Sequence, residues 1–347
     1  MTLSVQSRFQ RAVMRGAGRI PSVVLQFLGQ WSRVNSAGDR LAPEMALTGL
    51  IADKVPSFAL GGDKPVAQAR ADVTENAAAL AEKLPAMAVE EDLVIDGPGG
   101  PIPATRYRAR VDSVGVVVFF HGGGFVVGDR VSHDNLVRRL ALSTGADILS
   151  VDYRLAPEHP FPAAVDDALV AWRFAVDKAP LWGVPTDHIA VAGASAGGNL
   201  AAVISQQVRE DEVTPCLQML IYPAVDSTTK RGSHREFAEG LYLTDAQIDW
   251  FFDTYLPDRT HRADPRASPL LADDLSGVAP AYVTVAGFDP LRDEGEAYAD
   301  LLEKAGVTVT RRRFDGLIHS FFNVVGAGRS GPAAVAEIAD AVRAGLH

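Results

Sequence analysis

A serine flanked by glycines is the residue of this chain best suited to act as a nucleophile. Ser195 lies in VAGASAGGNL at 191–200, with Gly193 before it and Gly197 after it. This G-x-S-x-G pattern follows a predicted strand and precedes a predicted helix, which is the context of a nucleophile elbow. A serine hydroxyl reacts when it stands on a tight turn within reach of a base, and the glycines leave that room. Because a glycine-rich turn also serves close packing, the motif alone does not decide the chemistry.

A second glycine run offers backbone donors for a developing negative charge. HGGGF at 121–125 follows the apolar segment 114–120, and three consecutive glycines let their N–H groups point into a cavity. The helix predicted directly after Ser195 adds amide donors and the positive end of its dipole. Two glycine amides can complete an oxyanion hole, in which the loss of one donor typically costs about 100- to 1,000-fold in turnover. Together the two motifs predict acyl-transfer chemistry.

The general base is predicted downstream, because hydrolases with such an elbow carry the acid and then the histidine after the serine. His319, in FDGLIHSFF, lies just after the predicted strand 307–314. His234 and His261 fall in a long segment between strands, and His347 is the last residue. We therefore expect His319 to be the base. The alternative is a hydrogen-bonded core histidine in an apolar loop.

The acid that orients this base is predicted in AGFDPLRDEG, which follows the predicted strand 281–287. Asp289 lies nearest the end of the strand and is the preferred candidate, with Asp293 in reserve. Asp293 and Glu294 are also explained as acids in the first turn of a helix, where they favour the helix dipole. The prediction for the site is therefore a serine–aspartate–histidine triad.

Short apolar runs and helical patterns alternate along most of the chain, and these elements must position the triad. The apolar runs are of buried-strand type and lie at 114–120, 146–153, 188–193, 216–222, 281–287 and 307–314. Helical patterns accompany them at 132–143, 163–178, 196–209, 293–305 and 332–345. The alternation predicts an α/β fold with a mostly parallel sheet covered on both faces. The segments 89–95 and 102–109, joined by a turn, predict a hairpin at its antiparallel edge.

Two segments do not fit this alternation. Residues 1 to about 85 have mostly helical patterns with proline and glycine breaks. Residues 226–275 hold Trp250, Phe251 and Phe252 where a short crossover would suffice, and such long insertions are typical of lids or binding elements. These aromatic side chains either line an acyl pocket or pack in the core.

The bulk composition limits the class of partner and the compartment. The 347 residues are 47% hydrophobic, enough for a large core, and the net charge of −10 argues against nucleic acid. No apolar run reaches the length that spans a bilayer. The segment 1–30 is predicted as an amphipathic surface or cap helix rather than a targeting segment. The single cysteine, Cys216, favours a cytoplasmic location and leaves export or envelope association open.

No metal site or cofactor is predicted. The eight histidines are scattered without ligand spacing, and Cys216 lies within a predicted core strand where a small apolar residue is expected. The expected partner is a small-molecule ester. A homodimer is one of the assemblies that the residues leave open.

Five ordered motifs give the chain a resemblance to a known family. They are HGGGF at 121–125, DYRLAPEHPFPAA at 152–164, GASAGGNL at 193–200, DPLRDEG at 289–295 and GLIHSF at 316–321. Over about residues 75–345 the chain resembles the hormone-sensitive-lipase-like esterases. The resemblance implies the α/β-hydrolase fold, with a mostly parallel eight-stranded sheet, helices on both faces and a helical cap. It also implies a metal-free and cofactor-free serine carboxylesterase that hydrolyses short- to medium-chain esters through an acyl-enzyme.

The same resemblance assigns the site residues by position. Ser195, Asp289 and His319 match the family's catalytic residues. The oxyanion hole matches the glycine run and the residue after the nucleophile, namely Gly122, Gly123, Gly124 and Ala196. Within this set the resemblance implies that the amides of Gly123, Gly124 and Ala196 are the donors.

The resemblance also implies a cap that selects the substrate, built from residues 1–75 and from an insertion at 226–265. The remaining ranges, 76–225 and 266–347, form the expected core. One position departs from the family, which often carries an aspartate where this chain has Ala194. We expect that change to bear on the pH optimum and local rigidity more than on catalysis.

Two further expectations concern the loop 152–164 and the rival functions. Arg154 and Glu158 are suited to a buried ion pair that braces this loop without a chemical role. One rival function is a small-molecule receptor on the same fold that has lost catalysis, and the intact triad argues against it. A second rival keeps the serine chemistry but cleaves an amide or a lactone, which the same nucleophile and oxyanion hole would serve.

Overall fold

An eight-stranded sheet forms the centre of the molecule in the computed structural model, which describes residues 33–55, 60–62, 64–323 and 328–346. Its strands, in chain order, are β1 Val89–Gly97, β2 Gly100–Arg108, β3 Val116–Phe120, β4 Asp147–Val151, β5 Ile189–Ala194, β6 Gln218–Ile221, β7 Ala281–Phe288 and β8 Val309–Ile318. In space they are ordered β1-β2-β4-β3-β5-β6-β7-β8. The predicted α/β fold with a mostly parallel sheet is therefore confirmed.

The pairing follows the sequence patterns. β1 and β2 form the predicted hairpin, and β2 joins β4 in antiparallel register, whereas all pairs from β4 to β8 are parallel. β3 to β7 are buried throughout, which explains their continuous apolar runs. β8 extends to Ile318, beyond the predicted end at 314, because Ile318 still pairs with Phe288 past an irregular register. The strand therefore ends directly before His319.

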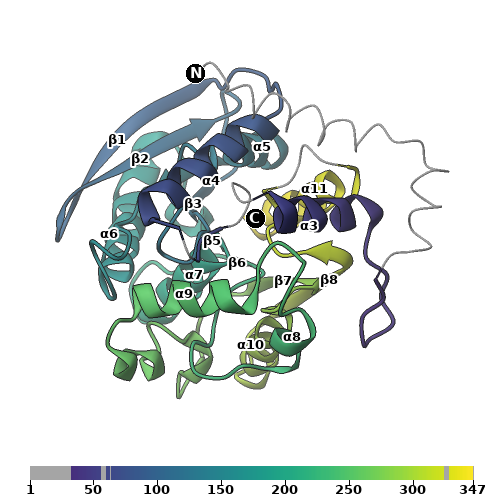
Figure 1. The fold of residues 1–347 in the computed structure, drawn as a ribbon. Helices are drawn as coiled ribbons and strands as arrows, with labels where there is room; N and C mark the ends of the chain where they lie inside the picture. Colours follow the sequence, from purple (N-terminus) through teal and green to yellow (C-terminus); the bar gives the residue numbers. More distant parts are fainter. Residues whose placement is uncertain (1–32, 56–59, 63, 324–327, 347) are drawn as a thin grey trace.

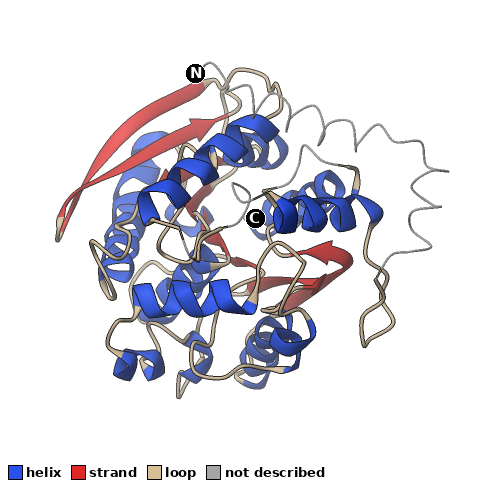
Figure 2. Ribbon diagram, viewed as in Figure 1, coloured by secondary structure: helices blue, strands red, loops and turns tan. Residues whose placement is uncertain are grey.

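Helices cover both faces of the sheet (Figures 1 and 2). One face packs against α6 Ala163–Lys178, α7 Ala196–Gln207 and α10 Arg292–Lys304, and the other packs against α5 Asp134–Thr144 and α11 Ser330–Gly345. Side chains alternate between the two cores along the central strands. In β3, for example, Val116 and Val118 point to the first core and Val117 to the second.

The remaining helices belong to the N-terminal segment and to the long insertion. They are α3 Pro43–Lys54, α4 Val66–Leu80, α8 Gly232–Glu236 and α9 Asp245–Tyr255, and short 3₁₀ helices lie at Ala179–Trp182, Thr186–His188, Arg259–Ala263 and Pro269–Leu271. Figure 1 shows α4 and α9 on the same side of the sheet. The helix predicted within 1–30 lies outside the described residues.

Two predictions about local packing were wrong. Arg154 does not pair with Glu158: its guanidinium binds Asp167 at 2.7 Å, because Asp167 on α6 is fully buried beneath the loop. Glu158 faces solvent and pairs at 2.7 Å with Arg70 of α4. Cys216 lies two residues before β6 and is half-buried rather than in the strand.

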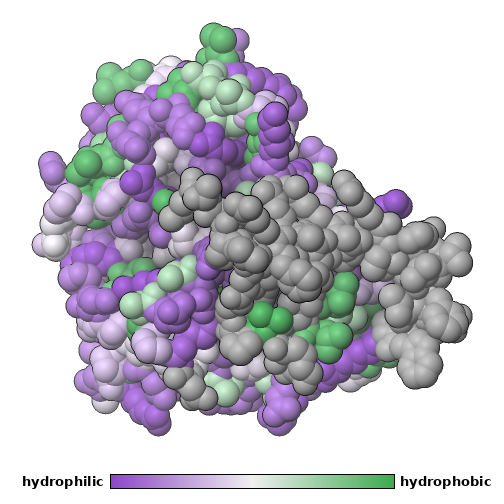
Figure 3. Space-filling view, turned by 45° about the horizontal axis from the view of Figure 1, so that its top comes forward, coloured by the Kyte–Doolittle hydropathy of each residue, from purple (hydrophilic) through white to green (hydrophobic). Residues whose placement is uncertain are grey.

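Where Figure 3 shows described residues, the hydrophobic ones lie in small groups among hydrophilic ones. Large exposed apolar side chains such as Val111 and Leu181 come from separate elements. Among the helices of the described ranges, none combines the length and the hydropathy that a bilayer span requires.

Candidate active site

Ser195 stands on a strained turn between β5 and α7. Its φ of 56° and ψ of −116° are unusual for a residue with a side chain, and its amide donates to the carbonyl of Ile221 at 2.9 Å. A Cβ at Gly193 would overlap the backbone of Gly197, and one at Gly197 would overlap the carbonyl oxygen of Phe120. The two glycines are therefore required by the close approach of β5, α7 and β3.

A continuous chain of hydrogen bonds joins the three predicted triad residues. Oγ of Ser195 lies 3.0 Å from Nε2 of His319, and Nδ1 of His319 lies 2.8 Å from Oδ2 of Asp289. Asp289 is fully buried and accepts a further hydrogen bond at 2.8 Å from the amide of Leu291. When the Nδ1–H group of His319 donates its hydrogen bond to Asp289, Nε2 is left as an acceptor for the serine hydroxyl. This is the arrangement in which imidazole can remove the serine proton.

Tyr222 forms one wall of the His319 site, and sequence reasoning did not identify it. The two ring centroids lie 4.6 Å apart with the ring planes at 57°. Tyr222 follows β6 with a φ of 37°, and its burial raises the pKa of the phenol well above its usual range, so the ring stays neutral. The only sequence signal was an aromatic residue at the end of a predicted strand.

The glycine run after β3 forms a turn that borders Ser195. Gly123 and Gly124 have φ values of 121° and 59°, and the carbonyl of Gly123 accepts from the amides of Val126 and Val127 at 3.1 and 3.0 Å. Within the described residues, the amides of Gly123 and Gly124 donate to no backbone carbonyl. The amide of Ala196 opens α7, where helical amides have no partner within the helix. These amides are thus available to an oxyanion.

Ala194, at the position where the resemblance often implies an aspartate, is buried at the end of β5. Its methyl group packs in the core on the α5 and α11 face and borders the pocket. No charge from this position therefore reaches the site.

A largely apolar pocket opens above Ser195 and His319. Its walls come from the glycine run, the N-terminal segment and the insertion, and they include Leu60, Val73, Phe125, Val127, Leu243, Ile248, Phe251, Phe252 and Leu291. Phe251 and Phe252 therefore line the pocket, whereas Trp250 packs on Gly61. Phe251 lies so close to Gly124 that a Cβ there would overlap its ring.

One side of the pocket is polar. His133 and Asn323 line it, and Nδ2 of Asn323 lies 2.9 Å from Nε2 of His133. Burial, reinforced by the neighbouring His121, lowers the pKa of His133 to about 3, so the ring is neutral at physiological pH. Its Nδ1 lies 3.2 Å from the carbonyl of Asp129. Sequence reasoning missed His133 because it belongs to no motif.

Among the residues that the structure describes, no three His, Cys, Asp or Glu side chains converge as a metal site requires.

The chain is similar to known proteins in sequence and in fold. Residues 117–323 match the family model described as the alpha/beta hydrolase fold. The carboxylic ester hydrolase LipN of Mycobacterium tuberculosis is 47% identical over 263 residues, which cover 74% of this chain and 70% of LipN. The ethyl acetate hydrolase of Pseudomonas putida is 37% identical over 293 residues, which cover 81% of this chain and 90% of that enzyme.

A solved structure extends the similarity to the backbone. The monoclinic form of an esterase from Pyrobaculum calidifontis superposes with a TM-score of 0.77 at 42% sequence identity. The match covers 81% of this chain and 94% of that esterase. The two backbones therefore share a fold over most of this chain.

Proposed function

Since the chain belongs to the hormone-sensitive-lipase-like branch of the alpha/beta hydrolase fold family, we propose that it hydrolyses short- to medium-chain carboxylic esters at Ser195. The observation that carries the proposal is the hydrogen-bonded chain from Ser195 through His319 to Asp289 at the floor of an apolar pocket. The named activities of LipN and of the ethyl acetate hydrolase support ester hydrolysis in particular.

The first half of the reaction forms an acyl-enzyme. Oγ of Ser195 attacks the ester carbonyl carbon while Nε2 of His319 takes the hydroxyl proton. The tetrahedral oxyanion accepts hydrogen bonds from the amides of Gly123, Gly124 and Ala196, and Gly122 provides the turn that leads into them. When the intermediate collapses, the bond to the alcohol oxygen breaks, and His319 gives its proton to the departing alcohol.

The second half repeats these steps with water. His319 removes a proton from water, which attacks the acyl carbon, and the bond to Oγ of Ser195 breaks as the serine regains its proton. Asp289 holds the tautomer of His319 through the 2.8 Å hydrogen bond and stabilises the imidazolium without becoming protonated. The enzyme and its protonation state are thereby restored.

The cap is the part of this proposal that bears on substrate choice. Val73 of α4, with Ile248 and Phe251 of α9, supplies the apolar wall opposite the triad. These residues come from the predicted cap ranges 1–75 and 226–265, of which residues 1–32, 56–59 and 63 lie outside the described part. Apolar burial of the acyl chain against this wall would stabilise the complex by about 0.8 kcal/mol for each methylene group.

A cytoplasmic location is proposed as well. It is supported by the single, half-buried Cys216, which has no disulfide partner within the chain. Fractionation of the producing cells, followed by immunodetection of the protein, tests this location; recovery in the envelope or the medium would contradict it.

The activity is tested with a series of p-nitrophenyl esters from acetate to palmitate. We expect turnover with a maximum among the shorter esters, and none above background for Ser195→Ala or His319→Ala folded and assayed in parallel. The absence of hydrolysis by folded native protein across the series would overturn the proposal and would favour a receptor. Faster turnover of matched lactones or anilides would shift the assignment to those bonds.

A further inference from the structure

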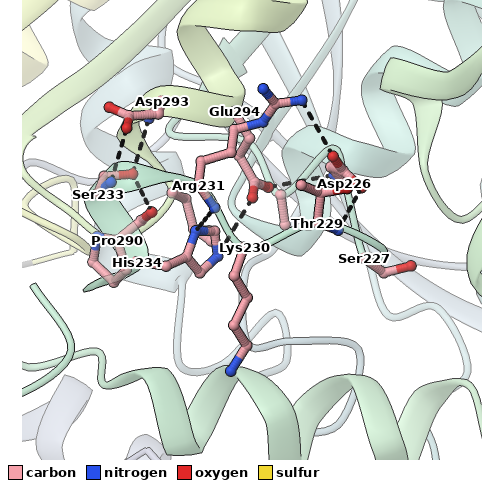
Figure 4. Close-up of polar contacts among 12 residues, drawn as sticks. Asp226, Ser227, Thr229, Lys230, Arg231, Ser233, His234, Pro290, Asp293 and Glu294 are labelled. Atoms are coloured by element: carbon pink, nitrogen blue, oxygen red, sulfur yellow. Dashed lines mark hydrogen bonds and ion pairs between the residues drawn. The ribbon is translucent and has the colours of Figure 1, made fainter. Parts of the chain in front are cut away.

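The insertion is attached to the loop that carries Asp289. Ser233 of α8 donates its hydroxyl to the carbonyl of Pro290 at 2.6 Å, and its amide donates to Oδ2 of Asp293 at 2.8 Å. In return the amide of Asp293 lies 3.2 Å from Oγ of Ser233. Figure 4 shows these contacts around the short helix α8. Since Pro290 follows Asp289 directly, α8 is hydrogen-bonded to the backbone next to the proposed catalytic acid.

Glu294, a second acid close to Asp289, has a buried side chain. Glu294, predicted as a first-turn helix acid, does lie in the first turn of α10 but is fully buried. Its Oε1 accepts from the amide of Val225 at 2.8 Å and lies 3.4 Å from the amide of Asp226. Its Oε2 lies 3.6 Å from Nε2 of His234 and has no hydrogen-bond partner among the described residues. A role confined to the helix dipole does not require such burial.

The segment that Glu294 holds borders the nucleophile. The amide of Ala224, one residue before Val225, donates to the carbonyl of Ser195 at 3.2 Å. The carbonyl of Ala224 accepts from Nδ2 of Asn199 at 2.7 Å, and the amide of Asn199 donates to the carbonyl of Ser195 at 3.0 Å. One side chain therefore joins the segment beside Ser195, the loop of Asp289 and the insertion.

The charge state of Glu294 suits a structural contact rather than an electrostatic one. Burial raises its pKa well above the usual range, and the nearby carboxylates of Asp226 and Asp289 act in the same direction. Burial also lowers the pKa of His234, whose Nδ1 lies 3.3 Å from the amide of Arg231. A neutral Glu294 adds no second negative charge beside Asp289, so the negative charge of the site remains on the acid that faces His319.

We propose that Glu294 is a positioning residue for the triad, which fixes the segment at Val225 and the loop at Asp289 relative to each other, with Ser233 as the attachment to the insertion. This inference rests on the proposed function, because it assigns Glu294 to the geometry of that same site. The residue touches no substrate. Glu294 keeps Ser195, His319 and Asp289 at the distances that the reaction requires. Turnover is sensitive to these distances, because a misplacement by about 1 Å can lower the rate by about 100-fold.

Two substitutions of Glu294 separate positioning from charge. Glu294→Gln keeps the oxygen that accepts from the Val225 amide, so kcat with p-nitrophenyl butyrate should remain within about threefold of native. Glu294→Leu leaves that buried amide without a partner, so kcat should fall by about ten- to hundredfold with little change in KM. A folded Glu294→Leu protein with native kcat, or a loss confined to KM, would overturn the proposal.

A milder variant covers the case in which Glu294→Leu does not fold. Ser233→Ala removes the hydroxyl that donates to the carbonyl of Pro290 and accepts from the amide of Asp293. We expect kcat to fall by about three- to tenfold at unchanged KM, because the loop of Asp289 loses both of these contacts. Native kcat in Ser233→Ala, together with a Glu294→Leu protein that does not fold, would reduce Glu294 to a stability role and would also overturn the proposal.

A spectroscopic measurement tests the geometry without any substrate. The Nδ1 proton of His319 lies in the hydrogen bond to Asp289 and should give a far-downfield proton resonance. It should persist in Glu294→Gln and broaden or vanish in Glu294→Leu. An unchanged resonance in Glu294→Leu would overturn the positioning role. If the native protein shows the resonance but hydrolyses no ester, the proposed function fails while the positioning role is still decided by the variants.

A matched control excludes a general effect of losing a buried carboxylate. Asp147, at the amino end of β4, is fully buried and pairs with Arg106 and Arg108 at 2.7 Å each. Asp147→Asn should lower the melting temperature but leave kcat and the downfield resonance unchanged. A loss of kcat in Asp147→Asn as large as in Glu294→Leu would show that destabilisation alone explains the effect.

Discussion

Nε2 of His319 lies 3.0 Å from Oγ of Ser195, although 124 positions separate the two residues. Ser195 follows β5 and His319 follows β8, with β6 and β7 between these strands in the sheet. Asp289, at the end of the intervening β7, completes the chain of hydrogen bonds. The carboxyl ends of the parallel strands therefore assemble the site.

Asp289→Asn tests the orienting acid. An amide cannot stabilise the imidazolium of His319 and favours the wrong tautomer, so kcat should fall by about 10⁴-fold with KM little changed. Steady-state kinetics with p-nitrophenyl butyrate measures both constants. Asp293→Asn is the matched control, because Asp293 contacts Ser233 rather than His319. Equal losses in the two variants would contradict the assignment of Asp289.

Gly124→Ala tests the oxyanion donors. Gly124 has a φ of 59° and lies against Phe251, so an added methyl group must displace the turn and its amide. We expect kcat to fall by about 100- to 1,000-fold. Gly122→Ala is the comparison, since its φ is not positive and a Cβ there would lie 3.0 Å from the carbonyl oxygen of Ala194, a milder overlap than the one at Gly124. The loss of kcat in Gly122→Ala should be much smaller than in Gly124→Ala. A larger loss in Gly122→Ala would indicate that the donors lie elsewhere in the glycine run 122–124.

Phe251→Ala tests the cap wall. Removing the ring enlarges the apolar pocket, so kcat/KM for p-nitrophenyl octanoate relative to butyrate should rise by about tenfold. Phe174→Ala, on α6 and outside the pocket, is the control and should leave this ratio unchanged. A constant ratio in Phe251→Ala would mean that the acyl chain binds away from α9.

His133→Gln tests the neutral histidine of the pocket. Burial lowers the pKa of His133 from its ordinary value of 6.5 to about 3 in the folded protein, so the unfolded chain takes up the proton first as the pH falls. The stability contributed by neutral His133 is complete above about pH 6.5 and declines toward pH 3, by at most about 1.4 kcal/mol per pH unit. Urea unfolding from pH 7 to pH 4 should show native protein losing stability relative to His133→Gln. If the free energies of unfolding of native protein and His133→Gln change in parallel with pH, the result would contradict a buried and neutral His133.

The main fold and the proximity of the three candidate triad residues were predictable because each signal was local. Apolar runs of buried type gave the strand positions, and parallel strands bring their carboxyl ends to one edge of the sheet. Ser195, Asp289 and His319 each directly follow a strand, so their meeting followed from topology. The end of β8 was misplaced, since Asp315 and Gly316 interrupt its apolar pattern although the pairing continues to Ile318. The start of β6 was also misplaced, because the strand begins two residues after Cys216.

Contacts that depend on tertiary packing were not predictable. Glu294 lies in a helix turn where an acid is common, and nothing nearby in sequence indicates that Val225 and His234 enclose it. Arg154 was assigned to the acid four residues away, whereas its partner Asp167 is set by how α6 packs under the loop. Tyr222 lacked any motif for the same reason, because its contact with His319 joins two loops of distant sequence.

The central claim is that Ser195 carries the acyl group, and phosphonate labelling measures it most directly. A p-nitrophenyl alkylphosphonate presents a tetrahedral centre that an activated serine displaces to form a stable adduct. Intact-mass and peptide mass spectrometry should show a single phosphonyl group per native chain, on the peptide that contains Ser195. The adduct should be absent in Ser195→Ala and form far more slowly in His319→Ala. An unlabelled Ser195 in folded native protein, or a label on another residue, would contradict the account.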